Sequence, residues 1–274
     1  MKNNVKNTLF AGILLSLISC EKIINIDLNS ADPKYVIEGI VSDTDEGATV
    51  KITQTKNFYE DNIFPGVENA IVKITERGGV THILQYVDSG LYRAPELKGV
   101  SGKTYELSAD INGHRFSAES QMPEPNSVDS IYFSRKKYPF SSDTVYAVVL
   151  KYTDSADTDD YWRFIMRIDR VKRKQVYTAS DEFVNGKPVT ARFEYHPHED
   201  DKNSPKLQYG DIMEIEMQCI DKYVYTYFNE LTKTIYGSSV GLGNPTSNIK
   251  GGALGYFSAH TVWKGAVVAG NTEE

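Results

Sequence analysis

Hydrophobic and polar residues alternate with a period of two along most of the chain after residue 34. The alternation begins in YVIEGIVSD (residues 35–43) and returns in short runs such as ATVKITQT, AIVKITER and TYELSADI. Runs of this length and period are typical of β-strands that bury one face. Asn112-Gly113 lies between two of the runs and predicts a tight hairpin, because both turn residues must accept a positive φ.

The alternation is interrupted at residues 123–127, Pro-Glu-Pro-Asn-Ser. Proline lacks a backbone N–H and is excluded from central strands, so we interpret this segment as a linker. Residues 34–122 are then an Ig-like or prealbumin-like β-sandwich, and residues 128–270 a second β-rich domain. The sequence therefore predicts a mainly all-β protein with two β-sandwich-like domains in tandem.

One segment of the second domain has a helical pattern instead. Its apolar side chains recur at helical spacing: Val224, Tyr227 or Phe228, Leu231 and Ile235. Asp221 is a good N-cap and Gly237 a good residue to follow the last turn. We predict an α-helix over residues 222–236, followed by an irregular Gly-rich loop over residues 237–252.

The first residues have the parts of an export signal. Two lysines precede an apolar run over residues 9–18, which is too short to span a membrane as a helix. The segment LISC (residues 17–20) matches a bacterial lipobox, whose cysteine takes a diacylglycerol thioether. We expect residues 1–19 to be a lipoprotein signal peptide, Cys20 the lipidation site and residues 20–33 a tether. A plain signal peptide with a chance cysteine, or a cytoplasmic protein with an apolar tail, are the alternatives.

Net charge indicates which electrostatic partners to expect, and cysteine content indicates whether a disulfide can form. The chain has 30 Lys and Arg against 37 Asp and Glu, a net charge of −7. We interpret it as mildly acidic without a basic stretch, and so expect neither nucleic acid nor an anionic lipid surface as an electrostatic partner. With Cys20 lipidated, Cys219 has no disulfide partner within the chain. Cys219 lies in the alternating run MEIEMQCI, which predicts a sheet or core position.

Two clusters of polar residues are candidate chemical sites. Four carboxylates within residues 154–160 could bind Ca²⁺, but the EF-hand spacing is absent and a solvated turn is the alternative. His196 and His198 could bind a metal, or form a polar hairpin tip. The chain has no G-x-S-x-G motif, and its Gly-rich loop lacks the order of a phosphate-binding loop. We therefore predict no catalytic residue, no metal site and no cofactor, and a protein that is not an enzyme.

The chain also resembles a known family. The phrases that carry the likeness are CEKIINIDL, DPKYVIEGIVSD, FPGVENAIVKI, SGLYRAPELKGVSGKTYEL, FSAESQMPEPNSVDSI, SDEFVNGK and NPTSNIKGGALGYFSAH. Together they resemble the Bacteroidetes lipoproteins classed as domain of unknown function 4249 (DUF4249). The likeness covers nearly all of the chain after Cys20, and Cys20 is the one functional residue that it transfers.

The resemblance implies a role rather than a reaction. Members of this family resemble surface partners of TonB-dependent transporters, so we expect an outer-membrane, surface-exposed, lipid-anchored protein that binds or assists such a transporter in nutrient uptake. Contact residues are expected in the Gly-rich loop at Asn244, Pro245 and Asn248, although all three could serve only as turn residues. A surface adhesin or assembly subunit is the main alternative, and a hydrolase with a dispersed site is a further one. The ligand stays open.

Overall fold

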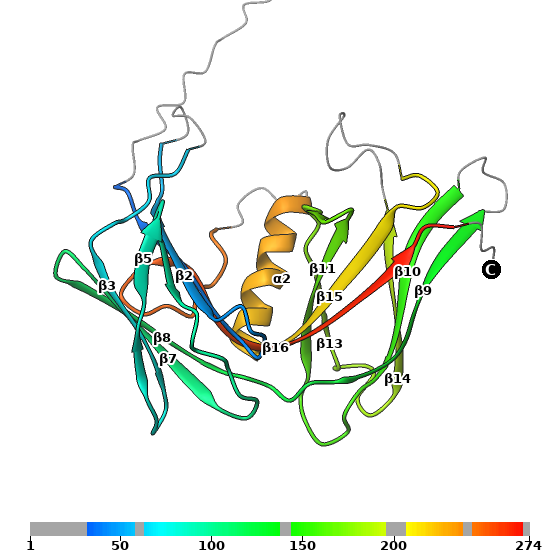
Figure 1. Ribbon diagram of the computed structural model, residues 1–274, viewed down its shortest axis with the longest axis horizontal. Coiled ribbons are helices and arrows are strands. Elements are labelled where there is room, and N and C mark those ends of the chain that lie inside the picture. Colours follow the sequence, from blue (N-terminus) through cyan, green and yellow to red (C-terminus); the bar gives the residue numbers. More distant parts are fainter. Residues whose placement is uncertain (1–31, 58–62, 138–143, 196–206, 238–242, 271–274) are drawn as a thin grey trace, which may run out of the picture. The chain divides into compact units, whose positions relative to one another are not determined.

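The computed structural model describes residues 32–57, 63–137, 144–195, 207–237 and 243–270. Most of these residues lie in β-strands, which form three sheets (Figure 1). The largest sheet has nine strands, eight of which follow the order β12-β11-β15-β16-β1-β2-β6-β5, while β13 pairs with β11. Its strands are β1 (Tyr35–Ser42), β2 (Ala48–Gln54), β5 (Gln85–Asp88), β6 (Leu91–Ala94), β11 (Tyr161–Ile168), β12 (Val171–Lys172), β13 (Tyr177–Ser180), β15 (Ile212–Ile220) and β16 (Leu254–Val268).

Two smaller antiparallel sheets pack against the large one. The four-stranded sheet has the order β4-β3-β7-β8, and the three-stranded sheet the order β14-β10-β9. Their strands are β3 (Ala70–Glu76), β4 (Thr81–Ile83), β7 (Thr104–Ile111), β8 (His114–Gln121), β9 (Ser127–Lys137), β10 (Thr144–Thr153) and β14 (Pro188–Tyr195). Each packs over one part of the large sheet, which produces two sandwich-like halves. The predicted mainly β fold with sandwich-like sheets and one helix is confirmed.

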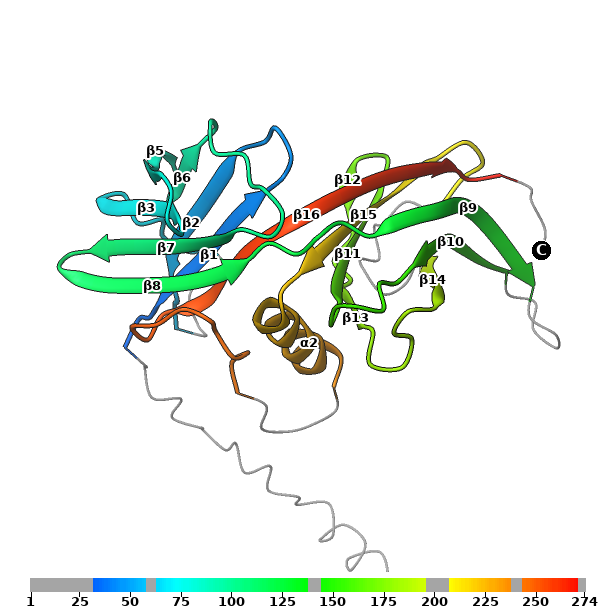
Figure 2. The ribbon, with the colours of Figure 1, turned by 90° about the horizontal axis from the view of Figure 1, so that it is seen from below.

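Strand β16 is shared by both halves. Residues 254–260 run parallel to β1, with Val36 opposite Leu254 and Ser42 opposite His260, and residues 261–268 run antiparallel to β15. Figure 2 shows the strand, coloured from orange to red, passing from the first half into the second. The predicted second domain, residues 128–270, includes all of β16. In the structure, by contrast, residues 254–260 complete the sheet of the first half.

Alternation along β16 determines what lies on each face of the large sheet. Phe257 and Ala259 belong to the core of the first half, and Trp263 packs against the core of the second half. Tyr256, on the opposite face, packs beneath the helix. Because successive side chains of a strand point to opposite faces, both small sheets lie on one face of the large sheet and the helix lies on the other.

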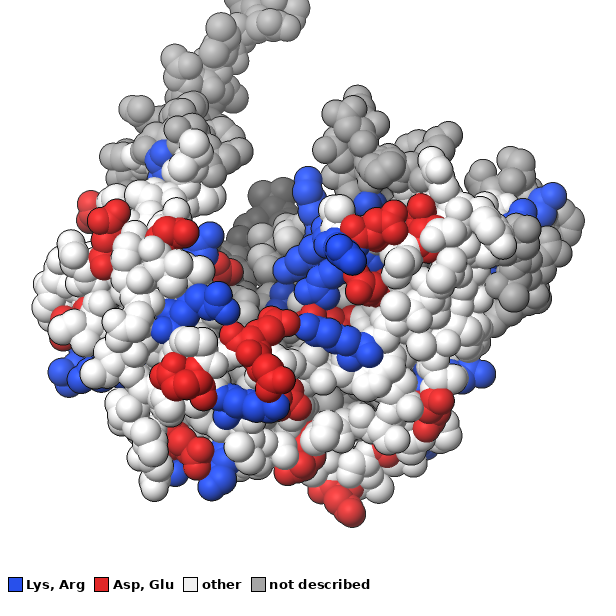
Figure 3. All heavy atoms as spheres, in the orientation of Figure 1, with Lys and Arg blue, Asp and Glu red and all other residues white. Residues whose placement is uncertain are grey.

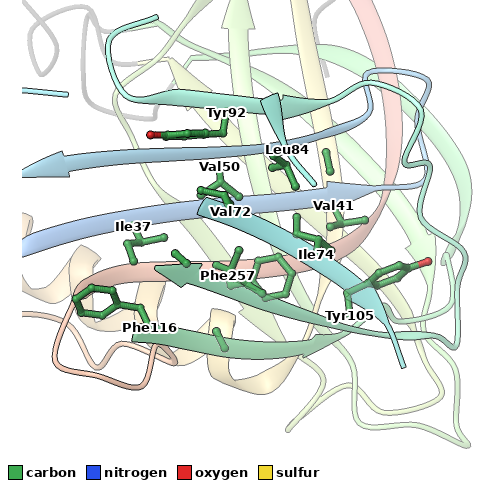
Figure 4. Packing of buried hydrophobic residues seen from close by; sticks show 14 of the residues in the cluster. Ile37, Val41, Val50, Val72, Ile74, Leu84, Tyr92, Tyr105, Phe116 and Phe257 are labelled. Carbon is green, nitrogen blue, oxygen red and sulfur yellow. The ribbon is translucent and has the colours of Figure 1, made fainter. Parts of the chain in front are cut away.

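The first core depends on a close approach between β1 and β16. Gly39 lies opposite Phe257, and a Cβ on Gly39 would come within 2.8 Å of the Phe257 ring. The absence of a side chain at Gly39 therefore leaves room for that ring. Figure 4 shows Phe257 among Ile37, Val41 and other apolar side chains of this core.

Two local predictions are confirmed. Helix α2 spans Lys222–Tyr236, and the Asp221 side chain accepts hydrogen bonds from the first free N–H groups at its N-terminus. Gly237 ends the helix, with an extended backbone (φ −77°) and its N–H donating to Lys233 O at 2.8 Å. Asn112 and Gly113 have φ values of 51° and 83° and form the two-residue turn between β7 and β8.

Candidate binding site

A cleft of about 620 Å³ lies at the junction of the two halves, and we call it the junction cleft. Its walls come from the end of β8 and the following linker on one side, and from the start of β11 and of α2 on the other. The side chains that shape it include Arg77, Glu119 and Met122 from the first half and Asp159, Tyr161 and Tyr223 from the second. Binding pockets of this size commonly lie between structural units.

The floor of the junction cleft is held by Ser120 and Asp221. The Ser120 hydroxyl donates to one carboxylate oxygen of Asp221 and accepts from the backbone N–H of Ala259 at 2.8 Å. The other oxygen of Asp221 accepts from the N–H groups of Tyr223 and Val224, both at 2.9 Å. Burial raises the pKa of Asp221, and these hydrogen bonds oppose that shift. One carboxylate therefore caps α2 and ties it to the first half.

The acidic segment over residues 154–160 borders the junction cleft. Asp154 is buried and accepts from the N–H of Gly186 at 2.7 Å. Burial raises the pKa of Asp160; a hydrogen bond from Thr158 opposes the shift, and the neighbouring Asp154 adds to it. In the described part of the chain, no group of three or more His, Cys, Asp and Glu side chains is placed to hold a metal ion.

Aromatic and charged groups share the cleft walls. The Tyr223 side chain is on the surface, with the residue 69% exposed, and Tyr161 is partly buried. Arg77 is held by Glu106 and Glu119, with N–O distances of 2.8 and 2.5 Å. Among the lining residues, carboxylates outnumber cations, of which there are two, Arg77 and Lys222. The walls therefore suit a neutral or cationic ligand that can stack on tyrosine and donate hydrogen bonds to carboxylates.

The contact residues predicted from the Gly-rich loop lie elsewhere. Asn248 uses its side-chain amide on the backbone of Phe257: Nδ2 donates to the carbonyl at 2.8 Å, and Oδ1 accepts from the N–H at 2.9 Å. Asn244 is exposed and Pro245 partly buried, and none of the three lines the junction cleft. A contact role for them stays a prediction, and Asn248 has a structural role in addition.

Asn126 of the linker makes two hydrogen bonds to the second half. Asn126 Oδ1 accepts from Trp162 Nε1 at 2.9 Å and from the Cys219 thiol at 3.3 Å. Cys219 is buried in β15, so its predicted sheet position is confirmed, and burial raises the pKa of its thiol. Cys20, His196 and His198 lie outside the described residues.

One set of residues contradicts the expectation from sequence. Residues 167–174 read RIDRVKRK, and with Arg163 they place six basic residues within twelve positions. The chain therefore contains a basic stretch, and the expectation of none is wrong. The six residues occupy β11, β12 and the segments beside them. The six basic residues can be read directly from the sequence, but the net charge of the whole chain, −7, gives no indication of them.

Comparison with known proteins identifies the family. The family described as Domain of unknown function (DUF4249) matches residues 21–265. The chain belongs to the DUF4249 family. None of the curated proteins matches it.

The DUF4249 match covers both halves and ends inside β16. Two phrases that carry the family likeness, YVIEGIVSD and NPTSNIKGGALGYF, meet in the structure, because the first forms β1 and the second leads into the part of β16 that pairs with it. Two segments that carry the likeness, far apart in the sequence, are therefore neighbours in the large sheet. Among the described residues, no helix combines the length and the apolar content needed to cross a membrane.

Proposed function

We propose that this DUF4249 protein is an outer-membrane lipoprotein, anchored through Cys20, that assists a TonB-dependent transporter in nutrient uptake. It binds its ligand in the junction cleft and does not act as an enzyme. The observation that carries the binding role is the cleft itself, because both halves contribute to a hollow of about 620 Å³ with aromatic and charged walls. Hollows of this size bury most of a small ligand.

The cleft walls define a class of ligand. Tyr161 and Tyr223 offer ring faces on which a sugar or a peptide side chain can stack. Glu119 and Asp159 offer carboxylate oxygens, which accept hydrogen bonds from hydroxyl or ammonium groups. A neutral saccharide or a short peptide satisfies both requirements.

The cellular setting rests on the N-terminal sequence and on the family resemblance. The lipobox around Cys20 supports a lipid anchor, and the likeness to Bacteroidetes lipoproteins supports an outer-membrane, surface-exposed position beside a TonB-dependent transporter. An anchored binder raises the local concentration of ligand at the transporter without any new affinity. A surface adhesin or assembly subunit is the alternative function.

The transporter partnership is tested by co-purification. The full chain is tagged at its C-terminus, outer membranes are solubilised gently, and proteins that co-purify in stoichiometric amounts are identified. Recovery of a TonB-dependent barrel supports the proposal. Recovery of the protein alone, or with other surface subunits and with nutrient uptake unchanged on deletion, supports the adhesin or assembly role.

The cleft is tested separately by ligand-detected NMR with a panel of neutral oligosaccharides and short peptides. Tyr223→Ala removes one aromatic wall, and Phe183→Ala removes a side chain of a residue that is 82% exposed and does not line the cleft. We expect a compound whose saturation-transfer signal is lost in Tyr223→Ala and retained in Phe183→Ala. A signal that survives in both variants places the ligand elsewhere.

A further inference from the structure

Strand β8 lies at the edge of the four-stranded sheet and pairs with β7 on one side only. An edge strand presents the backbone N–H and C=O groups of its outer side to any chain that can lie alongside it. The last residues of β8, 119–121, also line the junction cleft. The cleft wall therefore includes a segment of sheet edge.

Existing hydrogen bonds show which residues of β8 direct their backbone groups outward. Ser117 donates to the Lys250 carbonyl at 3.2 Å and accepts from the Lys250 N–H at 2.7 Å, both across the outer edge. Met122, directly after β8, bonds instead to the chain on the β7 side. Because the backbone groups of successive strand residues alternate between the two sides, Glu119 and Gln121 face outward as Ser117 does.

The outward backbone groups of Glu119 and Gln121 are open. Neither residue makes a backbone hydrogen bond across the outer edge to any other residue that the structure describes. Both residues are exposed, and unpaired backbone groups are rarely buried, so these groups face the cleft. The pairing of β8 with β7 has no bulge, and residues 118–121 include no Lys or Pro, two features that commonly protect an edge. Lys250 already pairs with this edge at Ser117, so the edge accepts an antiparallel partner.

Charge alone does not separate a saccharide from a peptide, the two ligand classes that the cleft walls suit. Arg77 at the cleft is paired with Glu106 and Glu119. Elsewhere on the surface, Figure 3 shows Asp and Glu side chains beside Lys and Arg side chains across the middle of the face that it presents. The uncharged backbone groups of the β8 edge are a more specific criterion, because their spacing matches that of another extended chain.

We propose that the junction cleft binds an extended peptide, which adds to β8 as a further strand through the backbone of Glu119 and Gln121. In this mode of recognition, main-chain hydrogen bonds provide affinity, and contacts to alternate side chains provide specificity. The opposite wall, with Tyr161 and Tyr223, supplies ring faces for those side chains. The inference rests on the proposed function, since it needs the junction cleft to be the binding site, and it narrows the ligand to a peptide.

Hydrogen exchange of the full chain without ligand tests whether the edge is open. The amides of Glu119 and Gln121 should exchange at least about tenfold faster than those of Ala118 and Ser120, whose backbone groups face β7. These two neighbours are the matched controls, because they lie on the same strand. Equal protection of all four amides would show that the edge is already occupied, and would overturn the proposal.

Peptide binding is tested with acetylated and amidated pentapeptides, used as the short peptides of the ligand-detected NMR panel. A pentapeptide whose signal is lost in Tyr223→Ala is synthesised again with one N-methyl group at each position in turn. N-methylation removes a backbone donor, so it should weaken binding about tenfold at the residues that face β8 and leave the intervening residues unaffected. The unmethylated peptide should also slow exchange at Glu119 and Gln121 about tenfold. An N-methyl effect that does not alternate, or unchanged exchange at both amides, overturns the proposal.

The same panel separates failure of this inference from failure of the proposed function. If oligosaccharides give a signal that is lost in Tyr223→Ala and no pentapeptide does, the cleft is a binding site and the peptide inference is wrong. If no compound of either class gives such a signal, the binding role of the cleft fails, and the peptide inference fails with it.

Discussion

The Ser120 hydroxyl donates a hydrogen bond to the Asp221 carboxylate, 101 residues further along the chain. Ser120 belongs to β8 in the first half, and Asp221 precedes α2 in the second half. Because the Ser120 oxygen also accepts from Ala259 of β16, one hydroxyl connects three elements around the junction cleft. The position of α2, and with it one wall of the cleft, depends on this connection.

Replacing Asp221 tests the connection. Asp221→Ala leaves the N–H groups of Tyr223 and Val224 without their acceptor and removes the partner of Ser120. We expect the free energy of unfolding in urea to fall by about 2 kcal/mol. Asp221→Asn is the control, since its side-chain oxygen can still cap the helix, and it should lose less. Equal stability of Asp221→Ala and the unmodified chain would show that the cap contributes nothing.

Acid sensitivity is expected from His260. This residue is buried in β16 beside Ser258, with 2.9 Å between His260 Nδ1 and Ser258 Oγ. Burial, followed by the charge of Arg163, lowers the pKa of His260 from 6.5 to about 3. Between these two values the unfolded chain binds a proton that the folded chain does not. Acid therefore favours unfolding, by about 1.4 kcal/mol per pH unit at most. The contribution is fully present above pH 6.5 and is lost as the pH falls.

Urea unfolding at a series of pH values measures this effect. His260→Gln removes the titrating group, so its stability should depend less steeply on pH between 6.5 and about 3 than that of the unmodified chain. His114→Gln, at an exposed position on β8, should retain the original slope. Parallel curves for His260→Gln and the unmodified chain would rule out His260 as the source of acid sensitivity.

Local features of this fold could be predicted from sequence, and long-range ones could not. The helix over residues 222–236 and the Asn112-Gly113 turn depend on spacing and caps within a few residues. The pairing of β16 with β1 joins segments more than 200 residues apart, and alternation alone does not choose between possible partners.

The candidate site also depends on long-range contacts, which the sequence alone does not predict. The junction cleft is formed by residues that the chain brings together only after both halves have folded, as Glu119 and Tyr223 illustrate. Asn248 is predicted as a contact residue from its place in the Gly-rich loop, and that role stays a prediction. Its amide also holds the backbone of Phe257, and a sequence pattern does not separate these two roles.

Two glycines before and in β16 provide a matched pair. Gly252 and Gly255 both have positive φ values, 88° and 99°. A Cβ on Gly252 would meet nothing within 4 Å, whereas a Cβ on Gly255 would lie 2.1 Å from the backbone oxygen of Ile37. Gly252→Ala should therefore cost only the left-handed strain, about 1 to 2 kcal/mol. Gly255→Ala should cost about 1 to 3 kcal/mol more, because the β1 backbone must move. Equal losses in urea unfolding would contradict the close approach of β1 and β16.

The shared strand predicts that the two halves unfold together. Phe257 is buried in the first core, while both tryptophans of the chain, Trp162 and Trp263, pack in or against the second core. Phe257→Ala should lower the free energy of unfolding by about 3 to 5 kcal/mol. Because β16 continues from one core into the other, tryptophan fluorescence should report this loss although no tryptophan lies in the damaged half.

Two probes, one in each half, show whether the halves unfold together. Tryptophan fluorescence follows the second half, and hydrogen exchange at Ile52, in β2, follows the first half. Coincident urea transitions that shift together in Phe257→Ala indicate one cooperative unit, as expected when a central strand belongs to both sheets. A fluorescence transition that stays in place while Ile52 loses protection would show that the halves are independent. In that case β16 would only connect the halves, and the geometry of the junction cleft would be free to change with ligand.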